Sequence, residues 1–287
     1  MPNSIIHYAL LTLSVTIIGG SLAPRVSSLS VLAGEWGIAK LALRNPDCCV
    51  VSVSGLEHHL RALQQEIVDK GLTDLDLRSR IRTGQTYVSN DCSRVLSSIV
   101  VKPHGVENSS IAASVAALEE LASGVASLVE GSLKIDDVHM RVVCASEYRA
   151  MDPMFHTDKC PLRAYVTLCG VGTEIMTRPC SPIEYMSLRS LGKQPSGEPS
   201  DSVREAHELE FIVMKGDYYP QKVTTWLAKV WQRSYACVHR SPPGNGGRRV
   251  ILSIDLADGD DDREWYDAGQ KREWRSGMTQ RKSRLVA

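Results

Sequence analysis

Five short runs between Val138 and Leu256 are typical of β-strands: VHMRVVCAS (138–146), LRAYVTLCG (162–170), LEFIVMKG (209–216), YACVHR (235–240) and RRVILSIDL (248–256). Turn-forming or polar segments separate them, and no helical pattern stands between them. A series of short strands without intervening helices predicts a sandwich or a barrel built from antiparallel pairs.

The residues before Val138 carry helical patterns instead. The segment LEHHLRALQQEIVDK (56–70) places leucine and isoleucine side chains at the spacing of one helix face, and a glycine follows it as a stop signal. A second, alanine-rich helix is expected over residues 111–129. Two apolar runs within residues 34–55, on either side of a proline, fit short strands.

The sequence therefore predicts an α+β protein in three parts. Residues 1–137 are a helix-rich N-terminal region that packs on a barrel, and residues 138–257 form the barrel itself. Residues 258–287 form a charged, solvated tail that changes from acidic to basic. The polar segment at residues 190–205 is expected to be a surface loop or a mobile lid.

The composition excludes several classes of protein. With 287 residues, 43% of them hydrophobic and 23% charged, the chain is long enough to bury a full core, which excludes disordered and fibrous proteins. The 33 basic and 33 acidic side chains balance. Because the chain lacks the positive field of a general nucleic-acid binder or a polybasic membrane protein, we expect no nucleic-acid partner.

The cysteines and the N-terminus bear on location. Eight cysteines occur without a Cys-x-x-Cys pair, and several lie inside apolar runs, where a free cysteine behaves as a small hydrophobic side chain. This favours a reducing, cytoplasmic location. The apolar stretch from Ile5 to Ile18 leaves a signal peptide in residues 1–24 open, although no Lys or Arg precedes it. The stretch is too short to cross a bilayer comfortably, so no membrane span is expected.

Phe155-His156-Thr157-Asp158 is the first element of a candidate metal site. On a strand, His156 and Asp158 point to the same face because side chains alternate with a period of two. One imidazole and one carboxylate placed in this way can bind the same metal ion. The motif is short enough to occur by chance, and its residues also fit ordinary polar positions at the end of a strand.

A distal histidine completes the set. His239 ends the run YACVHR, and Pro242 and Pro243 stop that strand directly afterwards. Two histidines and one carboxylate form the facial triad of non-haem Fe(II) oxygenases, which leaves coordination positions open for a co-substrate and dioxygen. His156, Asp158 and His239 are therefore the predicted metal ligands.

The order His-x-Asp, distal His and then an Arg on the last strand resembles the Fe(II)/2-oxoglutarate-dependent oxygenase superfamily. The blocks FHTDKCPLRAYVTLCGVGTEIM (155–176), MKGDYYP (214–220) and VHRSPP (238–243) also resemble a mainly bacterial domain family of unknown function. The resemblance spans residues 138–256. It implies a double-stranded β-helix of the jelly-roll or cupin type, with Fe(II) as the metal and 2-oxoglutarate as co-substrate.

The same resemblance assigns an arginine to the far carboxylate of 2-oxoglutarate. Arg248 and Arg249 are adjacent, so they point to opposite faces of the last strand. The face of Arg248 carries three aliphatic side chains that are typical of a hydrophobic core. Arg249 is therefore predicted to lie in the pocket, with Ser253 as a second donor on the same face.

Two further observations concern the co-substrate. Ile251 stands two positions after Arg249, where many members of the superfamily have a hydroxyl residue, and this departure leaves the use of 2-oxoglutarate open. Arg163, Tyr165 and Thr167 share one face of the run LRAYVTLCG. That face lies either against solvent or against the barrel cavity, where Arg163 and Tyr165 would supply donors for a carboxylate.

The sequence thus predicts an Fe(II)-dependent oxygenase that uses 2-oxoglutarate and dioxygen on an unidentified small-molecule or peptide substrate. Two other hypotheses stay open. One is a non-catalytic metal-binding or sensing barrel, and the other is a cupin-type metalloenzyme that does not use 2-oxoglutarate. Decarboxylation of 2-oxoglutarate to succinate would separate the oxygenase from both.

Overall fold

The structure is a computed structural model. It describes residues 36–45, 48–71, 74–83, 87–100, 109–128, 137–149, 152–191, 203–217, 219, 236–242, 244, 247–256 and 272–273. The N-terminal stretch considered as a signal peptide, most of the loop predicted at residues 190–205 and most of the predicted tail lie outside these residues.

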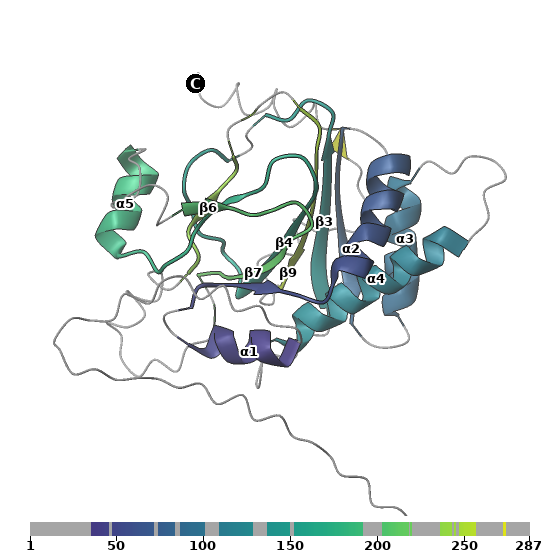
Figure 1. Ribbon diagram of the computed structural model, residues 1–287, viewed down its shortest axis with the longest axis horizontal. Helices are drawn as coiled ribbons and strands as arrows, with labels where there is room; N and C mark the ends of the chain where they lie inside the picture. The colour runs from purple at the N-terminus through teal and green to yellow at the C-terminus, as the bar shows by residue number, and fades with distance from the viewer. Residues whose placement is uncertain are drawn as a thin grey trace, which may run out of the picture.

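Two antiparallel sheets form the described part of the fold (Figure 1). The larger sheet has the order β1-β7-β4-β9-β3-β2-β10, and the smaller sheet has the order β6-β5-β8. The strands of the larger sheet are β1 (Val50–Val53), β2 (Leu75–Arg82), β3 (Asp137–Ala145), β4 (Leu162–Cys169), β7 (Phe211–Lys215), β9 (Arg249–Asp255) and β10 (Arg272–Glu273). The smaller sheet consists of β5 (Glu174–Met176), β6 (Val203–Glu205) and β8 (His239–Arg240).

Helices cover one face of the larger sheet, and Figure 1 shows α2, α3 and α4 stacked beside β3. These helices are α1 (Trp36–Arg44), α2 (Glu57–Gln64), α3 (Val88–Ile99) and α4 (Ser109–Ser127), and α2 continues as a π-helical turn, η1 (Gln65–Asp69). Their apolar side chains form one core with Val250, Leu252 and Ile254 of β9. The sequence prediction that these three residues face a hydrophobic core is confirmed, as are the α+β class and the two predicted helices.

The first apolar run within residues 34–55 is helix α1, so its prediction as a strand is wrong. Ala39 and Leu43 are the buried side chains of α1. They lie four residues apart, which places them on one face of a helix. The second run does form a strand, β1.

The strand-rich half also contains a helix that the sequence prediction missed. Helix α5 (Pro182–Leu191) follows β5. Its start carries ordinary signals, because proline occupies the first helical position and the hydroxyl of Ser181 accepts a hydrogen bond from the backbone N–H of Glu184 at 3.2 Å. One described helix, α5, therefore lies between the strands of this half.

The N-terminal and C-terminal parts of the chain share the larger sheet. β1 and β2 both precede residue 138, yet β1 pairs with β7 and β2 pairs with β3. β10, from beyond residue 257, pairs with β2. The division into parts at residues 1–137, 138–257 and 258–287 stays a prediction.

The register of β4 and β9 decides which side chains share the face turned away from α1–α4. Arg163 lies opposite Asp255, and Tyr165 lies opposite Ser253. Side chains directly opposite each other in an antiparallel pair lie on the same face. The smaller sheet packs on this face, where Ile175 of β5 joins a buried cluster with side chains of β1 and β7.

No helix in the described ranges is long and apolar enough to cross a membrane.

Candidate metal centre

His156, Asp158 and His239 lie together where the smaller sheet meets the segment before β4. Each offers one ligand atom, and these atoms all lie within 4.8 Å of one another. The backbones of His156 and His239 exchange two hydrogen bonds of 2.9 Å, which fixes the two residues opposite each other. Their ring centroids are 4.5 Å apart. The structure thus brings together the three residues that the sequence predicted as ligands.

Backbone carbonyls orient both imidazoles. The Nδ1 atom of His156 lies 2.9 Å from the carbonyl oxygen of Met154, and the Nδ1 atom of His239 lies 3.2 Å from that of Cys237. A carbonyl oxygen can only accept, so each Nδ1 carries a hydrogen, and Nε2 is the ring nitrogen left to face a metal ion. Metal-binding histidines in proteins are commonly oriented in this way.

The electrostatic surroundings favour a negative Asp158 carboxylate beside a neutral His239 imidazole. Asp158 Oδ1 accepts a hydrogen bond from Arg163 at 2.5 Å, and Asp158 Oδ2 lies 3.3 Å from His239 Nε2. Burial alone would raise the pKa of Asp158, but the charge and hydrogen bond of Arg163 and the two nearby histidines together hold that pKa below its usual value. Burial lowers the pKa of His239 to about 4, so this imidazole is neutral at neutral pH.

Arg163 links the cluster to the larger sheet. Its guanidinium binds both carboxylate oxygens of Asp255 at 2.6 Å while it also binds Asp158. Sequence reasoning missed Asp255, although alternation along β9 places it on the face of Arg249 and Ser253. The predicted contact of Arg163 with a co-substrate stays a prediction.

Arg249 is buried, with 2% of its surface exposed. Its Nε donates to the carbonyl oxygen of Val171 at 2.7 Å, and its Nη2 donates to the hydroxyls of Tyr165 and Thr173, both at 3.2 Å. The guanidinium carbon lies 4.5 Å from the ring centroid of Tyr148. Within the described part of the chain, all of these partners are neutral, and no carboxylate forms an ion pair with Arg249.

Ser253 and Tyr165, also predicted in the pocket, lie on the same face of the larger sheet as Arg249, the face turned away from α1–α4. Ser253 is buried and lies opposite Tyr165. Arg248, by contrast, precedes β9 and does not join the contacts of Arg249. Its Nε is buried without a hydrogen-bond partner among the described residues. Sequence reasoning missed Thr173 and Tyr148, because their contacts with Arg249 depend on long-range packing that a local pattern does not carry.

Thr167 is a further polar residue on the same face. It is 1% exposed, and its Oγ1 has no hydrogen-bond partner in the described ranges. In the register of β4 and β9 it lies directly opposite Ile251. The Thr167 hydroxyl therefore lies directly across the β4–β9 pair from Ile251, the position at which the resemblance predicts a hydroxyl residue.

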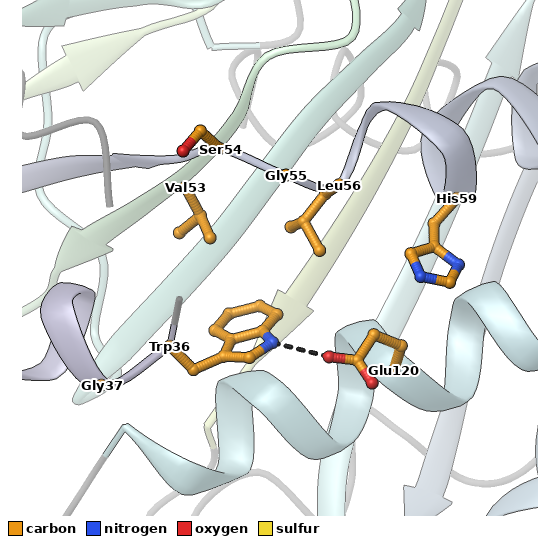
Figure 2. A pocket seen from close by; sticks show the side chains of 8 residues that line it. All are labelled: Trp36, Gly37, Val53, Ser54, Gly55, Leu56, His59 and Glu120. Carbon is orange, nitrogen blue, oxygen red and sulfur yellow. Dashed lines mark hydrogen bonds between the residues drawn. The ribbon is translucent and has the colours of Figure 1, made fainter. Parts of the chain in front are cut away.

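A separate cavity of about 410 Å³ lies on the helix side of the larger sheet (Figure 2). It is lined by residues of α1, the end of β1, the start of α2, and α4. Figure 2 shows Trp36 and Glu120 turned toward each other, with a hydrogen bond of 2.8 Å between the indole N–H and the carboxylate. This cavity contains none of the predicted site residues.

The fold and the site together define a protein of mixed helices and antiparallel sheets with a candidate site for a single metal ion. Residues 43–255, most of the chain, match the family described as proteins of unknown function, DUF1826. The chain belongs to this family. No curated protein matches the chain.

Three solved structures illustrate what the chain is similar to. The dioxygenase for auxin oxidation from rice is 14% identical, with 86% of this chain and 89% of that chain covered and a TM-score of 0.42. The dioxygenase for auxin oxidation 1 from Arabidopsis thaliana, in complex with 2-oxoglutarate, is 13% identical, with 79% and 90% covered and a TM-score of 0.41. A bsmA homolog from Methylobium petroleophilum PM1 is 13% identical, with 80% and 95% covered and a TM-score of 0.41.

Proposed function

We propose that this protein is an Fe(II)- and 2-oxoglutarate-dependent oxygenase whose two sheets form a double-stranded β-helix. The observation that carries the proposal is the buried guanidinium of Arg249. It lies on the same sheet face as Arg163, which binds Asp158 of the predicted metal cluster, and it has no anionic partner among the described residues. The metal and the co-substrate are each supported by the residues present.

The donor set fits Fe(II). Two imidazole nitrogens and one carboxylate oxygen on one side of an ion form the facial arrangement of non-haem iron oxygenases. His156 and His239 would bind through Nε2, because the Nδ1 atoms are turned to carbonyls. Asp158 would bind through Oδ2, because Oδ1 is held by Arg163.

The surroundings of Arg249 fit a dicarboxylate. Burying a charge is costly unless an opposite charge or several hydrogen bonds offset the lost hydration. One carboxylate of 2-oxoglutarate would supply that charge, and the hydroxyls of Tyr165 and Thr167 would donate to it. Arg163 and Tyr165 are two residues apart on β4, which separates their positions along the strand by about 7 Å. A short dicarboxylate can therefore reach from Arg249 toward the metal cluster.

When bound, the iron would supply dioxygen activation coupled to the oxidative decarboxylation of 2-oxoglutarate. The residues of the chain hold and orient the groups around it. Asp255 fixes Arg163, Arg163 fixes Asp158, and the backbone pairing of His156 with His239 fixes the two imidazoles. The substrate to be oxidised, a small molecule or a peptide, is not identified by these residues.

The test is conversion of 2-oxoglutarate to succinate by the full chain, with and without Fe(II), in air and without any further substrate. We expect succinate only when Fe(II) is present, and we expect Asp158→Ala to abolish it. Asp69→Ala is the matched control, because Asp69 is an exposed carboxylate in η1 on the helix side of the sheet.

If Fe(II) binds at the triad but no succinate forms, the oxygenase proposal is wrong, and the protein is a metal-binding barrel or an enzyme of the cupin type. If succinate forms equally well in Asp158→Ala, the ligand assignment is wrong.

A further inference from the structure

Cys49 and Cys237 are two buried thiols that the fold brings together from distant parts of the chain. Each is 1% exposed, and both belong to the apolar cluster between the two sheets. The Cys49 thiol lies 3.7 Å from the carbonyl oxygen of Met176, and the thiols of Cys49 and Cys237 are close enough to influence each other's pKa. Neither residue belongs to the predicted metal cluster, and the proposed oxygenase reaction does not use them.

Lys215 shows how the backbone holds the two cysteines side by side. Its N–H donates to the carbonyl oxygen of Cys49 at 2.9 Å, and its carbonyl oxygen accepts from the N–H of Cys237 at 2.8 Å. The N–H and C=O of one residue in an antiparallel strand point to the same side. Cys49 and Cys237 therefore both flank β7 on the same side, at neighbouring positions.

Cys49 differs from the other buried cysteines, including Cys237, whose pKa burial raises well above its usual value. The hydrogen bond from Cys237, followed by the charge of Lys215, lowers the pKa of the Cys49 thiol despite its burial. Burial raises the pKa of Cys92 and Cys180 to about 12 and that of Cys144 to about 11. Cys49 is thus the thiol of the pair that loses its proton more easily, and a second thiol is held beside it.

We propose that Cys49 and Cys237 form an intramolecular disulfide when the protein meets hydrogen peroxide. The Cys49 thiolate attacks one oxygen of the peroxide, which gives a sulfenic acid and releases hydroxide. The sulfur of Cys237 then attacks the sulfur of Cys49, and the S–O bond breaks with loss of water. Overall, two thiols and one peroxide give one disulfide and two water molecules.

The cross-link has a consequence for the neighbouring histidine. The Nδ1 of His239 donates to the carbonyl oxygen of Cys237, so a shift of the Cys237 backbone changes the orientation of His239. Oxidation is therefore expected to weaken metal binding. This consequence alone rests on the proposed metal site, whereas formation of the disulfide does not.

The experiment treats the metal-free full chain with hydrogen peroxide, blocks the remaining thiols and maps the cysteine peptides by mass spectrometry without reduction. All eight cysteines are free in the structure. We expect two thiols to be lost per chain, a peptide pair linked through Cys49 and Cys237, and full recovery on addition of dithiothreitol. Oxidation without that linked pair, or a pair containing other cysteines, would overturn the proposal.

Cys48→Ser is the matched control. Cys48 is adjacent to Cys49 but belongs to the core on the helix side of the sheet, and its thiol contacts the carbonyl oxygen of Val50. The linked pair is expected to persist in this variant and to vanish in both Cys49→Ser and Cys237→Ser. If the linked pair were lost in Cys48→Ser but persisted in Cys49→Ser, the assignment of Cys49 would be wrong.

A second measurement tests the coupling to the histidine. Mn(II), which peroxide chemistry disturbs less than Fe(II), is titrated into reduced and oxidised protein. We expect about tenfold weaker binding after oxidation, the scale on which partners of metal ligands act. Equal affinity in the two forms would refute the coupling and leave the disulfide site intact.

Discussion

The two faces of the seven-stranded sheet are both buried at their centre, but they bury different groups. Toward α1–α4, strands β4 and β9 present aliphatic side chains such as Val166 and Leu252. Toward the smaller sheet, the same two strands present Arg163, Arg249 and Asp255. The first face needs only close packing, whereas the second needs a partner for every polar group.

The two faces also differ in how fully their polar side chains are paired. On the polar face, Arg163 is satisfied by two carboxylates, but Arg249 has only neutral partners among the described residues, and the Thr167 hydroxyl has none. We therefore expect substitutions on the helix side to change stability and substitutions on the polar side to change binding. The predictions below test this division.

The largest effect is expected for His239→Ala. Removing one of three ligands should weaken metal binding by more than about 100-fold, because even the partners of metal ligands cost 10–100-fold when they are removed. Calorimetric titration with Mn(II) measures this. The exposed His207 supplies the control, since His207→Ala should bind like the wild type. Unchanged affinity in His239→Ala would refute the metal centre.

Leu252→Ala tests the helix side. Leu252 is fully buried in the core, so its truncation should lower the free energy of unfolding by about 2–5 kcal/mol in urea denaturation. The metal affinity of the folded variant should stay within about twofold of the wild type. Ser253→Ala, one residue further on and on the other face, should cost only about 1 kcal/mol. A large loss of metal binding in Leu252→Ala would break the division between the faces.

Thr167→Val is expected to give the smallest effect of the three variants. Unlike Leu252→Ala, it should not lower the stability of the protein. It removes a buried hydroxyl without a partner, so the free energy of unfolding without ligand should stay the same or rise by up to about 1 kcal/mol. Binding of 2-oxoglutarate should weaken by about 2- to 10-fold. In the control, Thr173→Val, stability should fall, because that hydroxyl accepts from Arg249. A destabilised Thr167→Val would mean that the hydroxyl is already satisfied.

Much of the site could be predicted from the sequence because alternation along a strand is a local property. The pattern of RRVILSIDL was enough to separate Arg249 from the aliphatic face, and the spacing of His156 and Asp158 was enough to pair them. The third predicted ligand, His239, was suggested by its place at the end of a short strand.

The remainder depends on contacts between segments that are distant in the sequence. The pairing of Asp255 with Arg163, and of Thr167 with Ile251, follows from the register of β4 and β9, which no single run contains. The proximity of Cys49 and Cys237 likewise depends on β7, because the backbones of both residues are hydrogen bonded to Lys215. Helix α5 is different, because its starting signals, Ser181 and Pro182, are local features of the sequence.

The most direct test of the central claim is the titration of 2-oxoglutarate into Fe(II)-loaded protein without oxygen, for the wild type, Arg249→Gln and Arg248→Gln. Removing the partner of a buried carboxylate should cost about 2–5 kcal/mol, which weakens binding by more than tenfold. We expect this loss in Arg249→Gln alone, with iron binding retained, and wild-type binding in Arg248→Gln. The claim is contradicted if the wild type does not bind 2-oxoglutarate, or if Arg248→Gln rather than Arg249→Gln loses it.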